Sequence, residues 1–443
     1  MKITFMGAGS TIFVKNIMGD VFLTESLRDV EVALYDIDQQ RLEDSRQIVD
    51  SLNQSINEGR ATVSAYFGEE QRKDALRGAI FVIDAIQVGG YRPCTVTDFE
   101  IPNRFGLRQT IGDTIGIGGI FRALRTIPVL DDFARDMEEV CPDAWFFNYT
   151  NPMSILTGYM LKHTGVKTVG LCHSVQVCVP ELLEHLKMTE YIKGAKWSIA
   201  GINHMAWLLD ISHSGKDLYP EIRRRAEARN VEFIAKGKDH GDLVRFEMMK
   251  QFGFYTTESS EHSAEYHPYF IKESRPELID RFKIPLDEYP RRCEKQIQEW
   301  KETRERLLKA PELEHSRSRE YAAGMMNAVV TDSPFEIGGN VMNNGLISNL
   351  PADACVEVPC IVNRNGVQGV YVGRIPSQLA ALNQTHINVH QLAVEAAATR
   401  SREAVYHAAM MDPHTRAELD LDQIREMCDA LFAAHADWLP VYK

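Results

Sequence analysis

The chain has 443 residues, of which 44% are hydrophobic and 25% charged, so it can build a large core and more than one domain. Its formal net charge of −13 argues against nucleic acid or an anionic membrane surface as the partner. No run of 18 apolar residues occurs and the opening residues MKITFMGAG enter a strand pattern directly, so we expect neither a membrane span nor a signal peptide.

The first half of the chain alternates strand and helix patterns. Short apolar strands are predicted at residues 2–6, 30–38, 62–67, 79–86, 144–152 and 167–174. Helical patterns separate them at residues 12–25, 39–57, 121–140 and 153–163. Strands that alternate with helices form right-handed crossovers, and the continuous apolar run AIFVIDAI is typical of a strand buried on both faces. The pattern therefore predicts a doubly wound parallel sheet of the Rossmann type, in the α/β class.

The second half mixes strands and helices without a regular alternation. Residues 197–215 suggest two strands around a polar turn, and Asn365-Gly366 is a strong hairpin pair within an alternating stretch. Residues 220–250 are predicted to be helical, residues 285–310 to form another helix, and residues 376–411 to form one or two core helices. Because no repeat or low-complexity linker is present, we expect a Rossmann-like domain at 1–195 interlocked with an α+β domain at 196–443, as in lactate and malate dehydrogenases.

The segment GAGST lies between the first strand and the first helix, where a dinucleotide-binding loop belongs. The third glycine of the usual fingerprint is absent, because Ile12 takes its place, and a lone GxG is equally consistent with a simple turn. Asp36 and Asp38 close the second strand, where a carboxylate binds a ribose 2′-hydroxyl and repels a 2′-phosphate, which favours NAD over NADP. The predicted cofactor-binding residues are Gly7, Gly9, Ser10, Thr11, Asp36, Asp38, Gln87 and Asn148.

The segment VGLCHSVQ places Cys172 and His173 at the end of a buried strand, the edge at which open parallel sheets bind ligands. Three interpretations of the thiol remain open: a nucleophile beside its base, a metal ligand, or a packed side chain. A thiolate and an imidazole, such as His204 of GINHM, suit a borderline-soft divalent cation. The eight scattered cysteines favour reduced thiols in a cytoplasmic protein.

The segment ESSEHSAEYHPYF is dense in titratable side chains. It holds Glu258, Glu261, His262, Glu265, Tyr266, His267 and Tyr269. Either a solvated loop or the wall of a polar pocket would have this composition. The long glycine-bearing connection at residues 87–120 follows a buried strand, and loops of that length usually carry function or cover a site.

Together these segments resemble glycoside hydrolase family 4. The likeness runs along the chain in ITFMGAGSTIFVKN, LYDID, IQVGGY, TIGDTIGIGGIFRALRTIP, FNYTNPM, GLCHSVQ, AGINHMAW, TESSEHSAEYHPYF, PLDEYPRR, VYHAAMMDPHT and ADWLP. Within the family, the residues CHSV are characteristic of the bacterial α-galactosidase (melibiase) branch. Relatives that cleave phosphoglycosides carry an acidic or amide residue after the cysteine.

The resemblance implies NAD and a divalent metal, usually manganese, with Cys172 and His204 as the metal ligands. It implies that Asn151, Asn148 and Arg291 contact the sugar, with Asn148 also near the cofactor. The substrate would be a small α-galactoside such as melibiose. Members of the family are commonly homodimers or homotetramers, so an oligomer is expected here as well.

The resemblance also implies an oxidation–elimination–addition–reduction mechanism, a known exception to hydrolysis by two carboxylates. His173 stands where phosphoglycosidase relatives have an acidic proton donor. The base that removes the C2 proton would lie in the segment 258–267, with Tyr266 and His262 as candidates and Glu261 or Glu265 behind them. The cycle would be redox-neutral, because the hydride taken from C3 is returned.

Other functions are consistent with parts of the sequence. The dinucleotide half alone would equally suit an NAD-dependent hydroxy-acid dehydrogenase, which consumes NAD stoichiometrically. A regulatory protein that senses NAD without turnover is a second alternative, although it has no need for the thiol–imidazole pair or the crowded segment 258–270. Within family 4, an α-glucosidase or α-glucuronidase remains possible.

Overall fold

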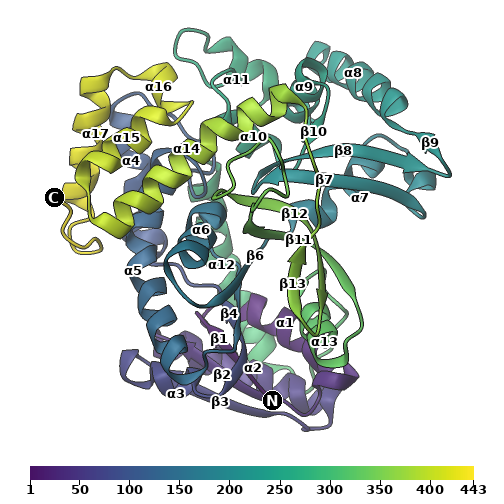
Figure 1. The fold of residues 1–443 in the computed structure, drawn as a ribbon, viewed down its shortest axis with the longest axis vertical. Coiled ribbons are helices and arrows are strands. Elements are labelled where there is room, and N and C mark those ends of the chain that lie inside the picture. Colours follow the sequence, from purple (N-terminus) through teal and green to yellow (C-terminus); the bar gives the residue numbers. More distant parts are fainter.

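The computed structural model describes residues 1–443, and apolar strands in the first half of the chain form the parallel part of its sheet (Figure 1). These strands are β1 (Lys2–Met6), β2 (Glu31–Asp36), β3 (Thr62–Phe67), β4 (Ala79–Asp84), β5 (Trp145–Asn148) and β6 (Lys167–Leu171). They lie in the spatial order β3-β2-β1-β4-β5-β6, all parallel. This is the order of the doubly wound dinucleotide-binding fold, so the predicted fold class is confirmed.

Helices cover both faces of these strands. They are α1 (Thr11–Phe22), α2 (Gln39–Asn57), α3 (Arg72–Leu76), α4 (Val96–Arg104), α5 (Gly116–Val140), α6 (Met153–His163) and α7 (Ser174–His185). Successive side chains of β4 point to opposite faces: Phe81 and Ile83 join the core beneath α1 and α2, whereas Val82 joins the core beneath α5. Burial on both faces explains why this strand is apolar throughout.

The second half of the chain extends the same sheet with antiparallel strands. These are β7 (Ala195–Ile202), β8 (Met205–His213), β9 (Lys216–Asp217), β10 (Tyr255–Thr256), β11 (Phe335–Met342), β12 (Cys355–Asn363) and β13 (Gly366–Gly369). β11 pairs with β6, which places the antiparallel half beside the carboxyl end of the last parallel strand. The predicted hairpin is confirmed, and Gly366 adopts a φ of 89° in its turn.

The helices of the second half are α8 (Tyr219–Ala235), α9 (Leu243–Phe252), α10 (Ser260–Tyr266), α11 (Glu277–Phe282), α12 (Glu288–Lys309), α13 (Ala322–Thr331), α14 (Ser377–Thr399), α15 (Arg402–Met411), α16 (Thr415–Glu418) and α17 (Leu421–Ala434). The stretch 220–250, predicted as helical throughout, is interrupted between α8 and α9. Gly237 and Gly241 lie in the interruption with positive φ angles, which a helix cannot accommodate.

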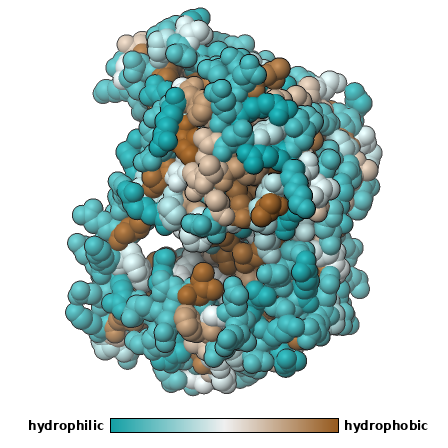
Figure 2. All heavy atoms as spheres, turned by 90° about the vertical axis from the view of Figure 1, so that its left-hand side faces the viewer, coloured by the Kyte–Doolittle hydropathy of each residue, from teal (hydrophilic) through white to brown (hydrophobic).

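The two halves share one core. The largest buried cluster runs from Ile3 in β1 to Ile387 in α14, and β6 and β11 join the two halves of the sheet. The division at residue 195 therefore remains a prediction about how the chain is organised. The C-terminal helices α15 and α17 lie against α5 and α4 at one side of the molecule (Figure 1), and that side is mostly hydrophilic with an apolar streak near mid-height (Figure 2). None of the helices is both long and apolar enough to cross a membrane.

Candidate active site

The carboxyl ends of β4, β5 and β6 open into a cavity of about 530 Å³. Segments that follow these three strands supply one wall, and residues from distant parts of the chain supply the other. The lining residues are Ser10, Phe13, Ala85, Ile86, Gln87, Ile111, Asp113, Arg122, Tyr149, Thr150, Asn151, Met153, Leu171, Cys172, His173, His204, Glu258, His262, Tyr289 and Arg292. The cavity therefore lies at the edge of the sheet where the sequence predicted a ligand site.

The glycine loop reaches this cavity through Ser10, which precedes α1. Gly7 has a φ of 82°, and a Cβ atom there would lie 2.7 Å from the carbonyl oxygen of Ala85, so no other residue fits. The backbone N–H groups of Thr11 and Ile12 have no acceptor in the protein, as expected for the first turn of a helix. The loop thus offers N–H donors and a helix N-terminus to an anionic group.

Asp36 and Asp38 have different environments at the end of β2. The Asp36 carboxylate accepts hydrogen bonds from the backbone N–H of Gly9 at 2.6 Å and of Asp38 at 2.8 Å. Asp38 accepts one from the backbone N–H of Arg41 at 3.0 Å and caps α2. Asp36 therefore supports the glycine loop directly, whereas Asp38 has a local role in the next helix.

Cys172, His204 and Glu258 converge at the cavity. Their ligand atoms all lie within 4.8 Å of one another, in an arrangement that could hold a metal ion. Cys172 follows β6, and His204 occupies the turn between β7 and β8. His204 and Glu258 have φ angles of 59° and 67°, an unfavourable region for residues other than glycine, and such strain is concentrated at functional sites. Arg245 donates a hydrogen bond to the Glu258 carbonyl and helps to hold this conformation.

The charges around this trio favour a cation. Burial lowers the pKa of His204, but the Glu258 carboxylate and the Cys172 thiol outweigh that effect and raise it to about 10. Burial raises the pKa of Glu258, but His204 and His262 lower it below its usual value. A site that draws a proton so strongly onto an imidazole is also suited to a divalent ion, for which thiolate, imidazole and carboxylate are ordinary ligands.

The two candidates for the base, His262 and Tyr266, both lie beside the metal-binding trio, but only His262 lines the cavity. His262 lines the cavity, with its Nδ1 atom 2.8 Å from the Ser259 hydroxyl, and burial lowers its pKa. Tyr266 lies behind His204, and its hydroxyl is 3.1 Å from His204 Nδ1. Burial raises the pKa of the Tyr266 phenol well above its usual value. A cation bound by His204 would instead lower the pKa of this phenol.

Two of the predicted site residues, His173 and Asn151, line the cavity, whereas Asn148 does not. Asn148 is fully buried and donates hydrogen bonds to the Thr157 hydroxyl at 3.1 Å and the Thr150 carbonyl at 3.2 Å. It supports the turn after β5 and does not line the cavity. This differs from the prediction because the side chain points into the protein and away from the open edge of the sheet.

Arg291 was predicted to contact substrate, but it is exposed on α12, where it donates to Glu288 at 2.9 Å. Its neighbour Arg292 lines the cavity instead. Consecutive helical residues point about 100° apart, so a motif such as PRR does not determine which arginine faces a site.

The comparisons with known proteins agree with this geometry. Residues 2–188 match the family described as Family 4 glycosyl hydrolase, and residues 199–415 match the Family 4 glycosyl hydrolase C-terminal domain. The chain belongs to glycoside hydrolase family 4. An α-galactosidase of Bacillus subtilis (strain 168) is 58% identical to this family 4 chain over 442 residues, covering 100% of both.

Two solved structures share the fold of this family 4 protein. A Bacillus subtilis protein described as a glucosidase has a TM-score of 0.86 at 26% identity, covering 97% of this chain and 99% of its own. A 6-phospho-α-glucosidase from gut microorganisms, solved in complex with NAD and Mn²⁺, has a TM-score of 0.77 at 21% identity and covers 100% of this chain and 99% of its own.

Three further residues of the family 4 site were not assigned from the sequence. They are Arg122, Tyr289 and Asp113. Arg122 is buried and lies 3.9 Å from the Asp113 carboxylate. It donates hydrogen bonds from Nη1 to the Tyr289 hydroxyl at 3.3 Å and from Nε to the Asn151 carbonyl at 3.2 Å. All three residues belong to segments that carry the family resemblance, so a signal for them was present. The sequence does not show that these residues meet in space, because Tyr289 follows Arg122 by 167 residues.

Glu265, a lower-ranked candidate for the base, holds a loop of the cavity in place. Its two carboxylate oxygens accept hydrogen bonds from the backbone N–H groups of Thr110, Ile111 and Gly112 at 2.9–3.2 Å. The same loop presents Ile111 and Asp113 to the cavity. Glu265 therefore shapes the site through the backbone.

Replacing Glu265 by glutamine is expected to lower the free energy of unfolding by about 2 kcal/mol, because an amide N–H₂ group would then face backbone donors. Urea denaturation measures the effect. Glu261→Gln, on the same helix α10 but with a partly exposed side chain, is the matched control and should leave the midpoint unchanged. Equal midpoints for the two variants would contradict the anchoring role.

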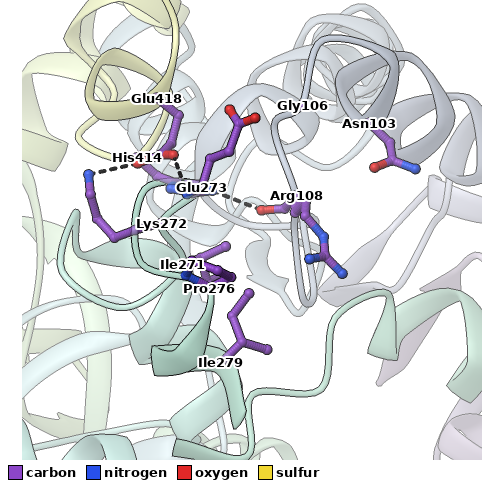
Figure 3. A pocket seen from close by; sticks show the side chains of 10 residues that line it. All are labelled: Asn103, Gly106, Arg108, Ile271, Lys272, Glu273, Pro276, Ile279, His414 and Glu418. Carbon is purple, nitrogen blue, oxygen red and sulfur yellow. Dashed lines mark hydrogen bonds and ion pairs between the residues drawn. The ribbon is translucent and has the colours of Figure 1, made fainter. Parts of the chain in front are cut away.

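A smaller cavity of about 190 Å³ lies away from this site (Figure 3). The loops around Arg108 and Lys272 meet α16 there. Lys272 pairs with Glu418 at 2.7 Å, and His414 Nε2 lies 2.8 Å from the Arg108 carbonyl. These contacts hold three segments together, and the cavity has neither a thiol nor a metal-binding group of side chains.

Proposed function

We propose that this protein is an α-galactosidase that hydrolyses small α-galactosides such as melibiose, with NAD and a divalent metal, manganese in the first instance. The observation that carries the proposal is that Cys172, His204 and Glu258 share one cavity with the glycine loop. A plain dehydrogenase has no need for this metal-binding trio beside its cofactor loop. The α-galactosidase relative at 58% identity over the full length supports the choice of substrate.

The residues present fit a divalent metal. A thiolate, an imidazole and a carboxylate are three ligands that leave positions for oxygen atoms of a substrate. His204 would bind through Nε2, the atom that lies 3.5 Å from Glu258, and would turn Nδ1 toward the Tyr266 hydroxyl. An outer hydrogen bond of this kind is the usual means of orienting a metal-binding histidine.

The residues also fit NAD. Gly7, the free N–H groups at the start of α1 and the Asp36 carboxylate are the three parts that a dinucleotide loop requires. Asp36 already accepts two backbone N–H groups, and a carboxylate has acceptor sites left for a ribose hydroxyl. Its negative charge disfavours a 2′-phosphate.

When bound, NAD would accept a hydride from C3 of the galactosyl unit and later return it, and the metal would polarise the C3 oxygen. In the elimination step the protein has to move two protons, one away from C2 and one to the leaving oxygen. Tyr266 and His262 are the candidates for removing the C2 proton, which the C3 ketone makes acidic. His173 is the candidate for protonating the leaving oxygen at C1, and water then adds to the unsaturated sugar.

Asp36→Ala is expected to weaken NAD binding by about 5- to 150-fold, equivalent to ~1–3 kcal/mol of lost hydrogen bonding. Calorimetric titration with NAD and NADP measures this, and NADP should bind the wild-type protein far more weakly than NAD. Asp38→Ala is the control: it removes a helix cap and should lower stability by about 1 kcal/mol with little change in NAD affinity. Equal affinity for NADP would contradict the assignment of Asp36.

One assay tests the proposed function against its alternatives. Aryl α-galactoside, α-glucoside and α-glucuronide would each be supplied with NAD, manganese and a thiol reductant. We expect turnover of the galactoside with no net consumption of NAD. Stoichiometric reduction of NAD by a hydroxy acid would instead identify a dehydrogenase.

We further propose that the enzyme works in the cytoplasm as a homo-oligomer. All eight cysteines are unpaired, which suits a reducing compartment and a thiol-containing metal site. We also keep residues 1–195 and 196–443 as the cofactor and substrate domains. Size-exclusion chromatography with light scattering would measure the oligomeric state directly.

A further inference from the structure

His173 is paired with a carboxylate that lies far from it in the sequence. Its Nε2 atom is 2.7 Å from Oε1 of Glu320, which follows it by 147 residues. The His173 side chain is 49% exposed and lines the cavity, whereas the Glu320 side chain is only 9% exposed. The carboxylate is thus largely withdrawn from water, unlike a surface ion pair, whose contribution is small.

Glu320 is held in place through the last turn of α1. Its backbone N–H donates to the Ser318 hydroxyl oxygen at 3.0 Å, and the Ser318 backbone N–H donates to Asp20 at 2.9 Å. His315 pairs with the same Asp20 carboxylate at 2.8 Å. Asp20 lies on α1, the helix that begins at the glycine loop. The segment 311–320 is therefore fastened along α1 and ends with Glu320 against His173.

The contact with Glu320 determines which ring nitrogen of His173 carries a proton. A carboxylate beside Nε2 keeps a proton on that nitrogen and fixes the plane of the ring, as the buried aspartate does in hydrolase triads. Nδ1 is then the nitrogen that is left to act on a substrate. The second Glu320 oxygen is buried without a partner, so no other contact competes for the carboxylate.

We propose that Glu320 is a positioning residue for His173 and that the segment fastened to α1 places it. That His173 protonates the leaving group rests on the proposed function. His173 enters the step with a proton on each ring nitrogen. As the C1–O bond breaks, the proton on Nδ1 passes to the departing oxygen, which takes the bonding electron pair. The electron pair left by the C2 proton forms the C1–C2 double bond. His173 ends neutral, with its Nε2 proton still donated to Glu320.

The first test does not depend on activity. Nitrogen-15 spectra of histidine-labelled protein report which ring nitrogen carries the proton, and His173→Gln identifies the His173 signals by their loss. In the neutral form of His173, reached on raising the pH, we expect Nε2 to be protonated in the wild type. We expect the tautomer mixture to change in Glu320→Ala, and Glu320→Gln, which keeps an acceptor oxygen, to lie between them. Glu314→Ala removes an exposed carboxylate from the same segment and should leave the signals unchanged. An unchanged tautomer in Glu320→Ala would overturn the proposal.

The second test separates positioning from a merely structural role. Glu320→Ala should lower kcat on melibiose or methyl α-galactoside by ~10- to 100-fold, while kcat on a dinitrophenyl α-galactoside changes by less than about twofold, because that leaving group needs no proton. Glu320→Gln should recover part of the loss. An equal loss on both substrates would overturn the proposal. If the wild type cleaves no α-galactoside, the proposed function fails, and the tautomer measurement still decides whether Glu320 positions His173.

Discussion

Replacing Cys172 by serine is expected to lower α-galactoside turnover by on the order of a thousandfold and to abolish the response to manganese, since a metal supplies several kcal/mol of charge stabilisation. Serine keeps the size of the side chain, but a hydroxyl is a far poorer ligand for this type of ion than a thiolate. Only His204 and Glu258 would remain of the trio. Calorimetric titration with Mn²⁺ and activity after chelation measure the two effects separately.

Cys141→Ser is the matched control, because Cys141 is a buried free thiol at the end of α5 and does not line the cavity. Chelators and thiol oxidants should inactivate the wild type, and manganese with a reductant should restore it. If Cys172→Ser bound manganese as tightly as the wild type, Cys172 would be a packed residue and the metal site would lie elsewhere.

Turnover in deuterated water is expected to place deuterium at C2 of the galactose product, because the proposed cycle removes and replaces the C2 proton. Mass spectrometry and proton NMR of the product measure the label. Substrates deuterated at C2 or C3 should be cleaved more slowly wherever those transfers limit the rate. Direct displacement at C1 by two carboxylates predicts neither result. Product without solvent deuterium, together with normal rates on both labelled substrates, would exclude the oxidation–elimination mechanism.

The same measurement assigns the base. Tyr266→Phe removes one hydroxyl and is expected to abolish C2 exchange while NAD still binds, since a cation bound to Nε2 of His204 would lower the pKa of the phenol through the ring that joins them. His262→Ala should retain exchange at a reduced rate, because its ring lines the cavity beside Glu258. The reverse pattern would transfer the role to His262, which reaches the cavity directly.

The sequence by itself was sufficient to predict the parallel sheet and the kinds of ligand-binding side chain at its edge. Strand and helix periodicity is local, so β3 and α6 begin and end at the predicted residues, and β4 is apolar because both of its faces are covered. The turn after β1 requires glycine at residue 7 because φ is 82° there, and this backbone conformation is also a local property. The family resemblance implied Cys172 and His204 as metal ligands, and their ligand atoms do lie close together.

Only the tertiary structure decided which side chains complete the site. Glu258 was one of several acidic residues in its segment, and its selection depends on the backbone that Arg245 holds and on the way β8 and β10 pair. Glu320 reaches His173 because the segment before α13 is fastened to α1. Asn148 turns inward from the strand that it closes. These outcomes depend on tertiary contacts between separate segments of the chain or on the direction of one side chain, and local sequence patterns encode neither.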